Sequence, residues 1–383
     1  MTGLQLTSLG MVTNVGHDVV TACASQRAGL VRNAPLDDVW AYDPSELEVR
    51  VTGAPIKGIA DGFVQTGKWV RLALLCLEDL VRYGRLPPRE NTAFWRTTGL
   101  LWVLPELTFE RFGWPEPETP RLLERYCGQL LRDLARIPFQ LLPDSFIASG
   151  PAGAPLALQK ASRSLGGAGP LGRLIVLASD SWLDNLSLRT LISENRLKTP
   201  ERATGLCPGE AAAAVLVEPT RQARTRGARL EANILGVATR PAPAAVDVED
   251  PTAARIRMAP DIARQLATAV AEVLDTVGGP RSFRGDIVLD LNGEDWKARV
   301  WGYARTILSQ HLNPGHMKEI FPAISFGDIG AAGGVAALCV AARSFSRGYA
   351  TADRVLSCSI SDSGETGAVL LGREAAVATR RDS

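Results

Sequence analysis

The chain has 383 residues, of which 46% are hydrophobic and 22% are charged, so it is long and apolar enough to bury a large core. Its 42 Lys and Arg residues nearly cancel its 41 Asp and Glu residues, which argues against binding nucleic acid or an anionic membrane through overall charge. We predict that the basic cluster at Arg221, Arg224, Arg226 and Arg229 is a solvated loop.

The six cysteines are scattered singly, without a C-x-x-C pair or a histidine at ligand spacing, so we predict no metal site. Cys76 and Cys339 stand among apolar residues, as small buried side chains of a reducing compartment do. The first six residues do not resemble a signal peptide. The longest stretch of small apolar residues, 329–342, is shorter than the roughly 20 residues of a membrane span. These features predict a cytoplasmic protein.

Strands and helices are predicted to alternate along the first half of the chain. In chain order we expect a strand over 4–12, a helix over 66–83, a strand over 98–104, a helix over 122–134, a helix over 151–165, and strands over 174–178 and 211–217. The segment 105–120 is rich in Pro and Glu and is expected to be an inserted loop.

The same kind of pattern starts again after residue 229. It predicts a strand over 230–237, a helix over 262–277, a strand over 286–290, helices over 296–308 and 330–344, and strands over 354–360 and 368–371. Two successive sets of this kind indicate an α/β protein with two similar halves. We place the halves at 1–219, with an inserted segment around 85–145, and at 228–383.

Four segments resemble the β-ketoacyl synthases of the thiolase-like superfamily, in the same order as in that family. They are 8–16 (similar to G-x-G-x-V-T-P-x-G), 207–218 (similar to G-E-G-A-x-x-x-x-L-E), 228–236 (the strand that opens the second half) and 325–333 (similar to G-H-x-x-G-A-A-G). The resemblance implies a thiolase-type fold: two βαβαβαββ halves in a layered αβαβα arrangement. It also implies a homodimer.

The resemblance also implies that the catalytic residues of a condensing enzyme are missing. Such enzymes hold an acyl group on a cysteine and use two histidines, or one His and one Asn, in decarboxylation. The cysteine position corresponds to Gly150 and the first histidine position to Asn292, which cannot shuttle a proton at neutral pH. The second histidine position corresponds to Gly327, or to Asp328 if the loop is one residue shorter. A carboxylate there would repel an enolate.

Four residues are predicted to line the ancestral acyl pocket: Ser149, Cys207, Asp328 and Asp362. Asp362 belongs to an acidic loop that replaces the family's Gly-Phe-Gly-Gly, and this loop disfavours an apolar chain. Ser149 and Cys207 are candidate substitute nucleophiles. The alternatives are that Ser149 caps the helix that begins at Pro151 and that Cys207 only lines the pocket. All three histidines (His17, His311 and His316) are expected at the surface, and no cofactor is expected.

The sequence therefore favours a non-catalytic pseudo-ketosynthase that binds, assembles or chaperones another protein. Degenerate thiolase-like proteins of this kind resemble accessory proteins of bacterial type VI secretion, so a secretion effector or adaptor is the expected partner. Candidate interface anchors, if not buried core, are Trp40, Trp69, Trp95, Trp102 and Trp114. One alternative is a chain-length-factor-like subunit that binds a ketosynthase or an acyl-carrier protein. Another is a residual synthase, acyltransferase or thioester hydrolase.

Overall fold

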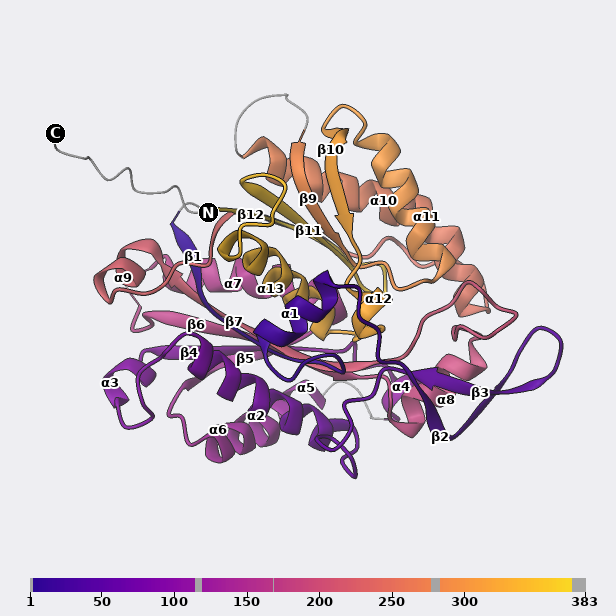
Figure 1. Ribbon diagram of the computed structural model, residues 1–383, viewed down its shortest axis with the longest axis horizontal. Helices are drawn as coiled ribbons and strands as arrows, with labels where there is room; N and C mark the ends of the chain where they lie inside the picture. The colour runs from indigo at the N-terminus through magenta and orange to yellow at the C-terminus, as the bar shows by residue number, and fades with distance from the viewer. Residues whose placement is uncertain (1–2, 114–118, 168, 277–282, 374–383) are drawn as a thin grey trace.

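The computed structural model describes residues 3–113, 119–167, 169–276 and 283–373 (Figure 1). Its strands are β1 (Leu4–Val12), β2 (Ala34–Tyr42), β3 (Glu48–Gly53), β4 (Thr98–Leu104), β5 (Gln140–Ala148), β6 (Arg173–Ser181), β7 (Glu210–Pro219), β8 (Ala232–Arg240), β9 (Phe283–Leu289), β10 (Leu312–Ile320), β11 (Arg354–Ile360) and β12 (Thr366–Gly372). The predicted mixed α/β class is confirmed.

The helices separate and cover these strands. They are α1 (Val19–Arg27), α2 (Gln65–Tyr83), α3 (Thr92–Trp95), α4 (Phe109–Phe112), α5 (Thr119–Leu123), the π-turn η1 (Glu124–Gly128), α6 (Gln129–Ala135), the 3₁₀ turn η2 (Gly150–Ala152), α7 (Gly153–Leu165), α8 (Asn185–Ser193), α9 (Thr220–Thr225), α10 (Pro251–Asp275), α11 (Asp295–Ile307), α12 (Ala323–Phe326) and α13 (Ala332–Ser346). Within the described residues, no helix is both long and apolar enough to cross a lipid bilayer.

The two halves of the large sheet have the same strand topology. Its strand order is β10-β9-β11-β12-β8-β1-β7-β6-β4-β5, and β1 pairs antiparallel with β8 at its centre. From the centre outwards, the first half runs β1, β7, β6, β4, β5, and the second half runs β8, β12, β11, β9, β10. Both halves have two antiparallel pairings followed by two parallel pairings. The two halves therefore share one topology, although no repeat is visible in the sequence.

The elements form five layers. In Figure 1, α2 and α6 cover the outer face of the first half, and α10 and α11 cover the outer face of the second. The helices α7 and α13 lie between the two halves, and each contacts strands of both. Strand β1 is buried along its whole length because it lies in the middle of this arrangement. The layered αβαβα arrangement is thus confirmed.

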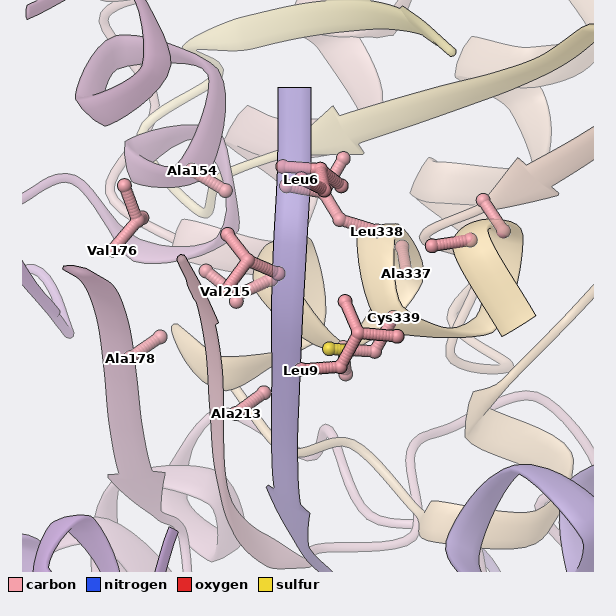
Figure 2. Packing of buried hydrophobic residues seen from close by; sticks show 14 of the residues in the cluster. Leu6, Leu9, Ala154, Val176, Ala178, Ala213, Val215, Ala337, Leu338 and Cys339 are labelled. Carbon is pink, nitrogen blue, oxygen red and sulfur yellow. The ribbon is translucent and has the colours of Figure 1, made fainter. Parts of the chain in front are cut away.

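Small side chains keep the central layer thin. Figure 2 shows Leu6 and Leu9 of β1 packed near Ala213 and Val215 of β7, with Ala337, Leu338 and Cys339 of α13 beside them. Close approach of a helix to a sheet needs such small residues, because interiors pack as densely as organic crystals. The alanines that the sequence places at helical spacing in α7 (Ala154, Ala157 and Ala161) are buried in this same layer.

Gly334 shows how tightly α13 packs against the turn η2. A Cβ atom at this position would lie 2.2 Å from the backbone oxygen of Pro151 and 2.8 Å from Ala154 Cβ. We expect Gly334→Ala to lower the free energy of unfolding by about 2 kcal/mol, because overpacking forces the helix away from the turn. Chemical denaturation measures this change.

Gly302 in α11 supplies the matched control, because a Cβ there meets nothing within 4 Å. Gly302→Ala is expected to raise the free energy of unfolding by up to about 1 kcal/mol, since Ala loses less backbone entropy than Gly in a helix. Equal effects of the two substitutions would contradict this account of Gly334.

Three strand regions escape the sequence prediction: the hairpin β2–β3, β5 and β10. Strands β5 and β10 are the two edges of the large sheet, so they bury less and lack the apolar run of a central strand. In β5, Asp144 has a φ of 53° and the pairing with β4 shifts register, which further hides the strand pattern.

The prediction of a solvated loop at 221–229 is partly right. Residues 220–225 form α9 instead of a loop, whereas Arg221, Arg224 and Arg229 are exposed as predicted. Two arginines that follow this helix lie beside buried glutamates. Arg226 Nε donates to Glu218 Oε1 at 2.9 Å, and Arg229 Nε lies 3.1 Å from Glu231 Oε1. Both carboxylates are almost fully buried, so these arginines are part of the fold.

The tryptophans divide between core and surface. Trp69, Trp95 and Trp102 are fully buried in the outer core of the first half, as expected for core residues, so they are not interface anchors. Trp40 is half-exposed on the β2–β3 hairpin and stays a candidate. Trp114 lies outside the described residues.

Candidate functional site

A polar cavity of about 280 Å³ lies where the two halves meet, near the turn η2. The first half contributes the loop after β4, the end of β6 and α8, and the second half contributes α10, α11 and the loops before α13 and β12. The charged residues of its lining are Glu106, Glu110, Arg111, Asp180, Glu194, Arg196, Arg255, Lys297, Asp328 and Asp362.

Gly150 forms one wall of the cavity, directly after β5. Its φ of 52° lies in the left-handed region, which glycine adopts without the strain of a side chain. A Cβ there would lie 3.2 Å from Ser361 Oγ and 3.8 Å from Glu106 Cγ. The Ser361 hydroxyl donates to the carbonyl of Ser149 at 2.5 Å and accepts from the amide of Ala152 at 3.0 Å. Ser361 of the second half therefore holds the turn η2 in place through two hydrogen bonds. Glu106 is the acidic residue closest to the Cβ position of Gly150.

Arg196 connects the two halves beside the cavity. Its Nε and Nη2 donate to the carboxylate of Glu294 at 2.8 and 2.9 Å. Its Nη1 and Nη2 donate to the carboxylate of Asp362 at 2.7 and 3.1 Å. Arg196 is only 3% exposed, so this double fork is shielded from solvent. Burial alone would raise the pKa of Asp362, but Arg196 and then Arg255 hold that pKa below its usual range.

A second buried pair joins α4 to the end of β6. Arg111 Nη2 donates to Asp180 Oδ1 at 2.6 Å, and Arg111 Nε donates to Ser187 Oγ at 3.0 Å. The guanidinium also lies 3.6 Å from the ring centroid of Trp182. Asp180 Oδ2 accepts from the amide of Ala331 at 2.9 Å, which ties the Gly-Ala-Ala-Gly segment to β6.

Asp328 lines the cavity and bonds to Asn292, which lies outside the lining. Asn292 Nδ2 donates to Asp328 Oδ2 at 2.6 Å, and Trp182 Nε1 donates to Asp328 Oδ1 at 3.2 Å. No cation bonds to Asp328 among the residues that the structure describes. Nearby, Lys297 Nζ lies 3.0 Å from Asp290 Oδ2. Burial raises the pKa of Asp290 to about 6, although Lys297 counters part of this effect.

Lowering the pH from about 7.5 to about 5 is expected to stabilise the protein by about 1 kcal/mol through Asp290. Its folded-state pKa of about 6 lies above the ordinary value of an aspartate, near 4. Between these values the folded protein binds a proton that the unfolded chain lacks, so stability increases as the pH falls. Urea unfolding at both pH values measures it.

The control for this pH dependence is Asp290→Asn, which removes the titrating group. Burial likewise raises the pKa of Glu106 and of Asp180, and these groups act in the same direction in both proteins. The difference between the two pH profiles therefore reports Asp290 alone. Parallel profiles for the wild type and Asp290→Asn would contradict the prediction.

In comparisons of sequence, no family model matches the chain, and no curated protein matches it either. Solved structures do match. A chain of a type II PKS complex, in which an acyl-carrier protein binds its ketosynthase, is 15% identical at a TM-score of 0.71 over 97% of this chain and 99% of that one. The ishigamide ketosynthase/chain length factor is 14% identical, with a TM-score of 0.70 over 97% and 99% of the two chains. A β-ketoacyl synthase from Burkholderia phymatum is 14% identical, with a TM-score of 0.67 over 97% and 100%.

The chain has the thiolase-like fold of the ketosynthases. This confirms the fold predicted from the four sequence segments. On this fold, the segments that the resemblance assigns to catalysis do converge: Gly150 and Asp328 line one cavity, and Asn292 bonds to Asp328. Gly327 is not part of the cavity lining. A Cβ atom at Gly327 would lie 2.9 Å from the backbone oxygen of Cys207.

Two of the four predicted lining residues, Asp328 and Asp362, line the cavity of this ketosynthase fold, whereas Ser149 and Cys207 are not part of its lining. Ser149 stands at the N-cap position of η2, but its side chain makes no capping hydrogen bond, so that prediction is wrong. Cys207 Sγ lies 3.7 Å from the carbonyl of Thr52. Burial, then Asp328, raises the pKa of the Cys207 thiol to about 11, so it is not a ready nucleophile.

The histidines lie away from this site. His17 and His316 are exposed as predicted, whereas His311 is half-buried, with its Nδ1 enclosed and without a hydrogen-bond partner among the described residues. None of the three lines the cavity. The described residues hold no group of three or more His, Cys, Asp or Glu placed to bind a metal ion.

Sequence reasoning missed the basic residues of the site: Arg111, Arg196, Arg255 and Lys297. Lys297 stands close in the chain to a predicted strand, seven residues after Asp290, whereas Arg196 lies between 178 and 211, where no element is predicted. Proximity to a predicted element does not distinguish a buried arginine from an exposed one.

Proposed function

We propose that this protein is a non-catalytic relative of the ketosynthases that acts as a binding, assembly or chaperone-type accessory protein. The observation that carries the proposal is the wall at Gly150, where the resemblance places the nucleophile. Glycine has no side chain to acylate, and the nearest acidic group is the Glu106 carboxylate. A carboxylate at this place would oppose formation of a thiolate and of an enolate.

The substitute nucleophiles offer little support for an enzyme. The Cys207 thiol has a raised pKa, and no histidine lines the cavity within the described part of the chain. Ser149 is not part of the cavity lining, which contains no histidine among the described residues. A serine needs an adjacent base to become a nucleophile at neutral pH.

Gly150→Cys tests whether the missing nucleophile alone explains the loss of activity. We expect neither the wild type nor this variant to gain an acyl group from an acyl-N-acetylcysteamine thioester, because Glu106 remains and no imidazole lines the cavity among the described residues. Intact-protein mass spectrometry reads the adduct, and a working ketosynthase is the positive control.

An acyl adduct on wild-type Cys207 or Ser149 would overturn the proposal. An adduct on Gly150→Cys alone would show that only the nucleophile is missing, and it would contradict the inhibitory role given to Glu106. Circular dichroism and thermal unfolding of the variant check that the protein still folds with a side chain at this left-handed position.

The proposed partner is a protein of type VI secretion, namely an effector or an adaptor, and the proposed location is the cytoplasm. We also propose a homodimer, which light scattering of the purified protein measures. Affinity purification from native cells, with mass spectrometry of the co-purified proteins, tests the partner. Recovery of an effector or adaptor supports the proposal, whereas recovery of acyl-carrier protein or a ketosynthase favours the alternative below.

The alternative is a chain-length-factor-like subunit, and one observation favours it: a chain of a ketosynthase/chain length factor matches this protein over 97% of its length. Such a subunit would pair with an active ketosynthase and keep an apolar tunnel for the growing chain. The charged lining of the cavity argues against that role, because burying charge beside an acyl chain is costly.

A further inference from the structure

The cavity beside Gly150 is small and strongly charged. At about 280 Å³ it falls just below the size of pockets that hold drug-sized molecules, so its volume suits a small solute. A cavity of this kind, built from both halves of the fold, is a binding site that the accessory role does not require. Its charges define what it would bind.

Lys297 presents unused hydrogen-bond donors to this cavity. The residue is 2% exposed, and an ammonium group has three donors. Among the described residues, Asp290 Oδ2 is the one hydrogen-bond partner of Nζ. The Asp290, Asp328 and Asp362 carboxylates keep the pKa of Lys297 above its usual range against the effect of burial. A charged donor that is buried without acceptors is costly, so a ligand with an acceptor oxygen would stabilise it.

The acids outnumber the bases around the cavity. Seven buried or half-buried carboxylates line the cavity or bond to its lining: Glu106, Asp180, Glu194, Asp290, Glu294, Asp328 and Asp362. Four cations line it: Arg111, Arg196, Arg255 and Lys297. Asp180, Glu194, Asp290, Glu294 and Asp362 each pair with one of these cations. Glu106 and Asp328 have no cation partner in the described part of the chain.

Glu106 is the acid that a ligand reaches most directly. Both of its carboxylate oxygens lie 3.2 Å from the amide nitrogen of Ser363, and its side chain lies beside the empty wall at Gly150. A ligand ammonium group there would compensate a carboxylate that the protein leaves without a counter-ion.

We propose that this cavity binds a small amphoteric molecule of the amino acid type, with an acceptor group on Lys297 and an ammonium group against Glu106. An anion would bond to Lys297 but face the uncompensated acids Glu106 and Asp328. A diamine would satisfy Glu106 but bring a second cation against Lys297 and Arg196. A molecule with both groups matches the unused donors of Lys297 and the Glu106 carboxylate together.

The test is thermal unfolding of the purified protein with the L-amino acids and 4-aminobutyrate, each at the same millimolar concentration. Succinate, 1,4-diaminobutane and 1,4-butanediol serve as probes that match 4-aminobutyrate in length and lack one or both of its charges. We expect at least one amphoteric probe to raise Tm and the three matched probes to have no effect. Calorimetric titration then gives its Kd.

Two variants locate the ligand. Glu106→Gln is expected to weaken binding of the amphoteric probe about tenfold or more, and Glu90→Gln, which changes an exposed acid outside the cavity, is expected to leave Kd unchanged. Lys297→Met is expected to weaken binding similarly, with Lys297→Arg as the version that keeps the charge if the first variant unfolds.

The proposal is overturned if no amphoteric probe binds, or if succinate or 1,4-diaminobutane binds as tightly as the amphoteric probes. It is also overturned if Glu106→Gln binds like the wild type. None of these results depends on a protein partner, so the ligand proposal and the accessory function can fail separately.

Discussion

Arg196→Met is expected to lower the free energy of unfolding by about 3–5 kcal/mol, which is among the largest effects of any single substitution in this protein. Arg196 donates hydrogen bonds to both Glu294 and Asp362, and its side chain is 2% exposed. Removing it leaves two carboxylates near the cavity without their main cation, and a buried charge without a partner is strongly destabilising. Urea denaturation followed by circular dichroism measures the loss.

The control for this prediction is Arg299→Met on α11. Arg299 Nε donates to Asp295 Oδ2 at 2.6 Å, but both side chains are about half-exposed. An exposed pair of this kind contributes little to stability, because solvent screens the interaction. If Arg196→Met were as mild as Arg299→Met, the buried network would not join the two halves as described.

The pH dependence of the same network has a definite sign. Glu294 and Asp362 have folded-state pKa values below the usual range, chiefly because Arg196 outweighs the effect of their burial. Their contribution is present above the unfolded pKa, near 4, and is lost as the pH falls below it. The deficit of Arg196→Met should therefore shrink under strongly acidic conditions.

Arg111→Met is the second substitution with a large expected effect, again about 3–5 kcal/mol. Asp180 is fully buried, and Arg111 is the cation paired with it. Without Arg111, this carboxylate keeps the backbone amides of Ser181 and Ala331 as donors but has no countercharge. Thermal and urea unfolding both report the loss.

The double variant Arg111→Met/Asp180→Asn separates charge from packing. Because the substitution at Asp180 replaces a carboxylate with a neutral amide, the double variant is expected to recover part of the stability that Arg111→Met loses. Any remaining loss reports the stacking of Arg111 on Trp182, whose ring centroid lies 3.6 Å away, and its bond to Ser187. A double variant less stable than either single one would contradict the pairing.

The close approach at Gly330 explains why the Gly-Ala-Ala-Gly segment is recognisable in the sequence. Its φ is 53°, and a Cβ there would lie 1.9 Å from Asp180 Oδ2. Glycine is thus required both by the backbone and by the carboxylate packed against it. The glycine of this segment therefore has a structural role beside the cavity.

The order of strands and helices, and through four motif segments the fold, follow from the sequence because they depend on neighbouring residues. Central strands such as β4 and β6 are continuous apolar runs, and α2 carries a periodic apolar face. The edge strands β5 and β10 escape prediction because an edge buries too little to leave such a pattern.

The residues that the resemblance assigns to the catalytic positions can be named from the sequence, but the cavity near those positions is a product of the tertiary structure. Arg196 meets Asp362 across 166 residues, and Arg111 meets Asp180 across 69. Local sequence propensity carries no information about such pairs, because the sequence around an arginine is the same whether its side chain is in water or bound to a carboxylate distant in the chain. The sequence therefore determined the order of the elements and the segments that resemble the family, and only the packing of the two halves decided which charges meet around the cavity.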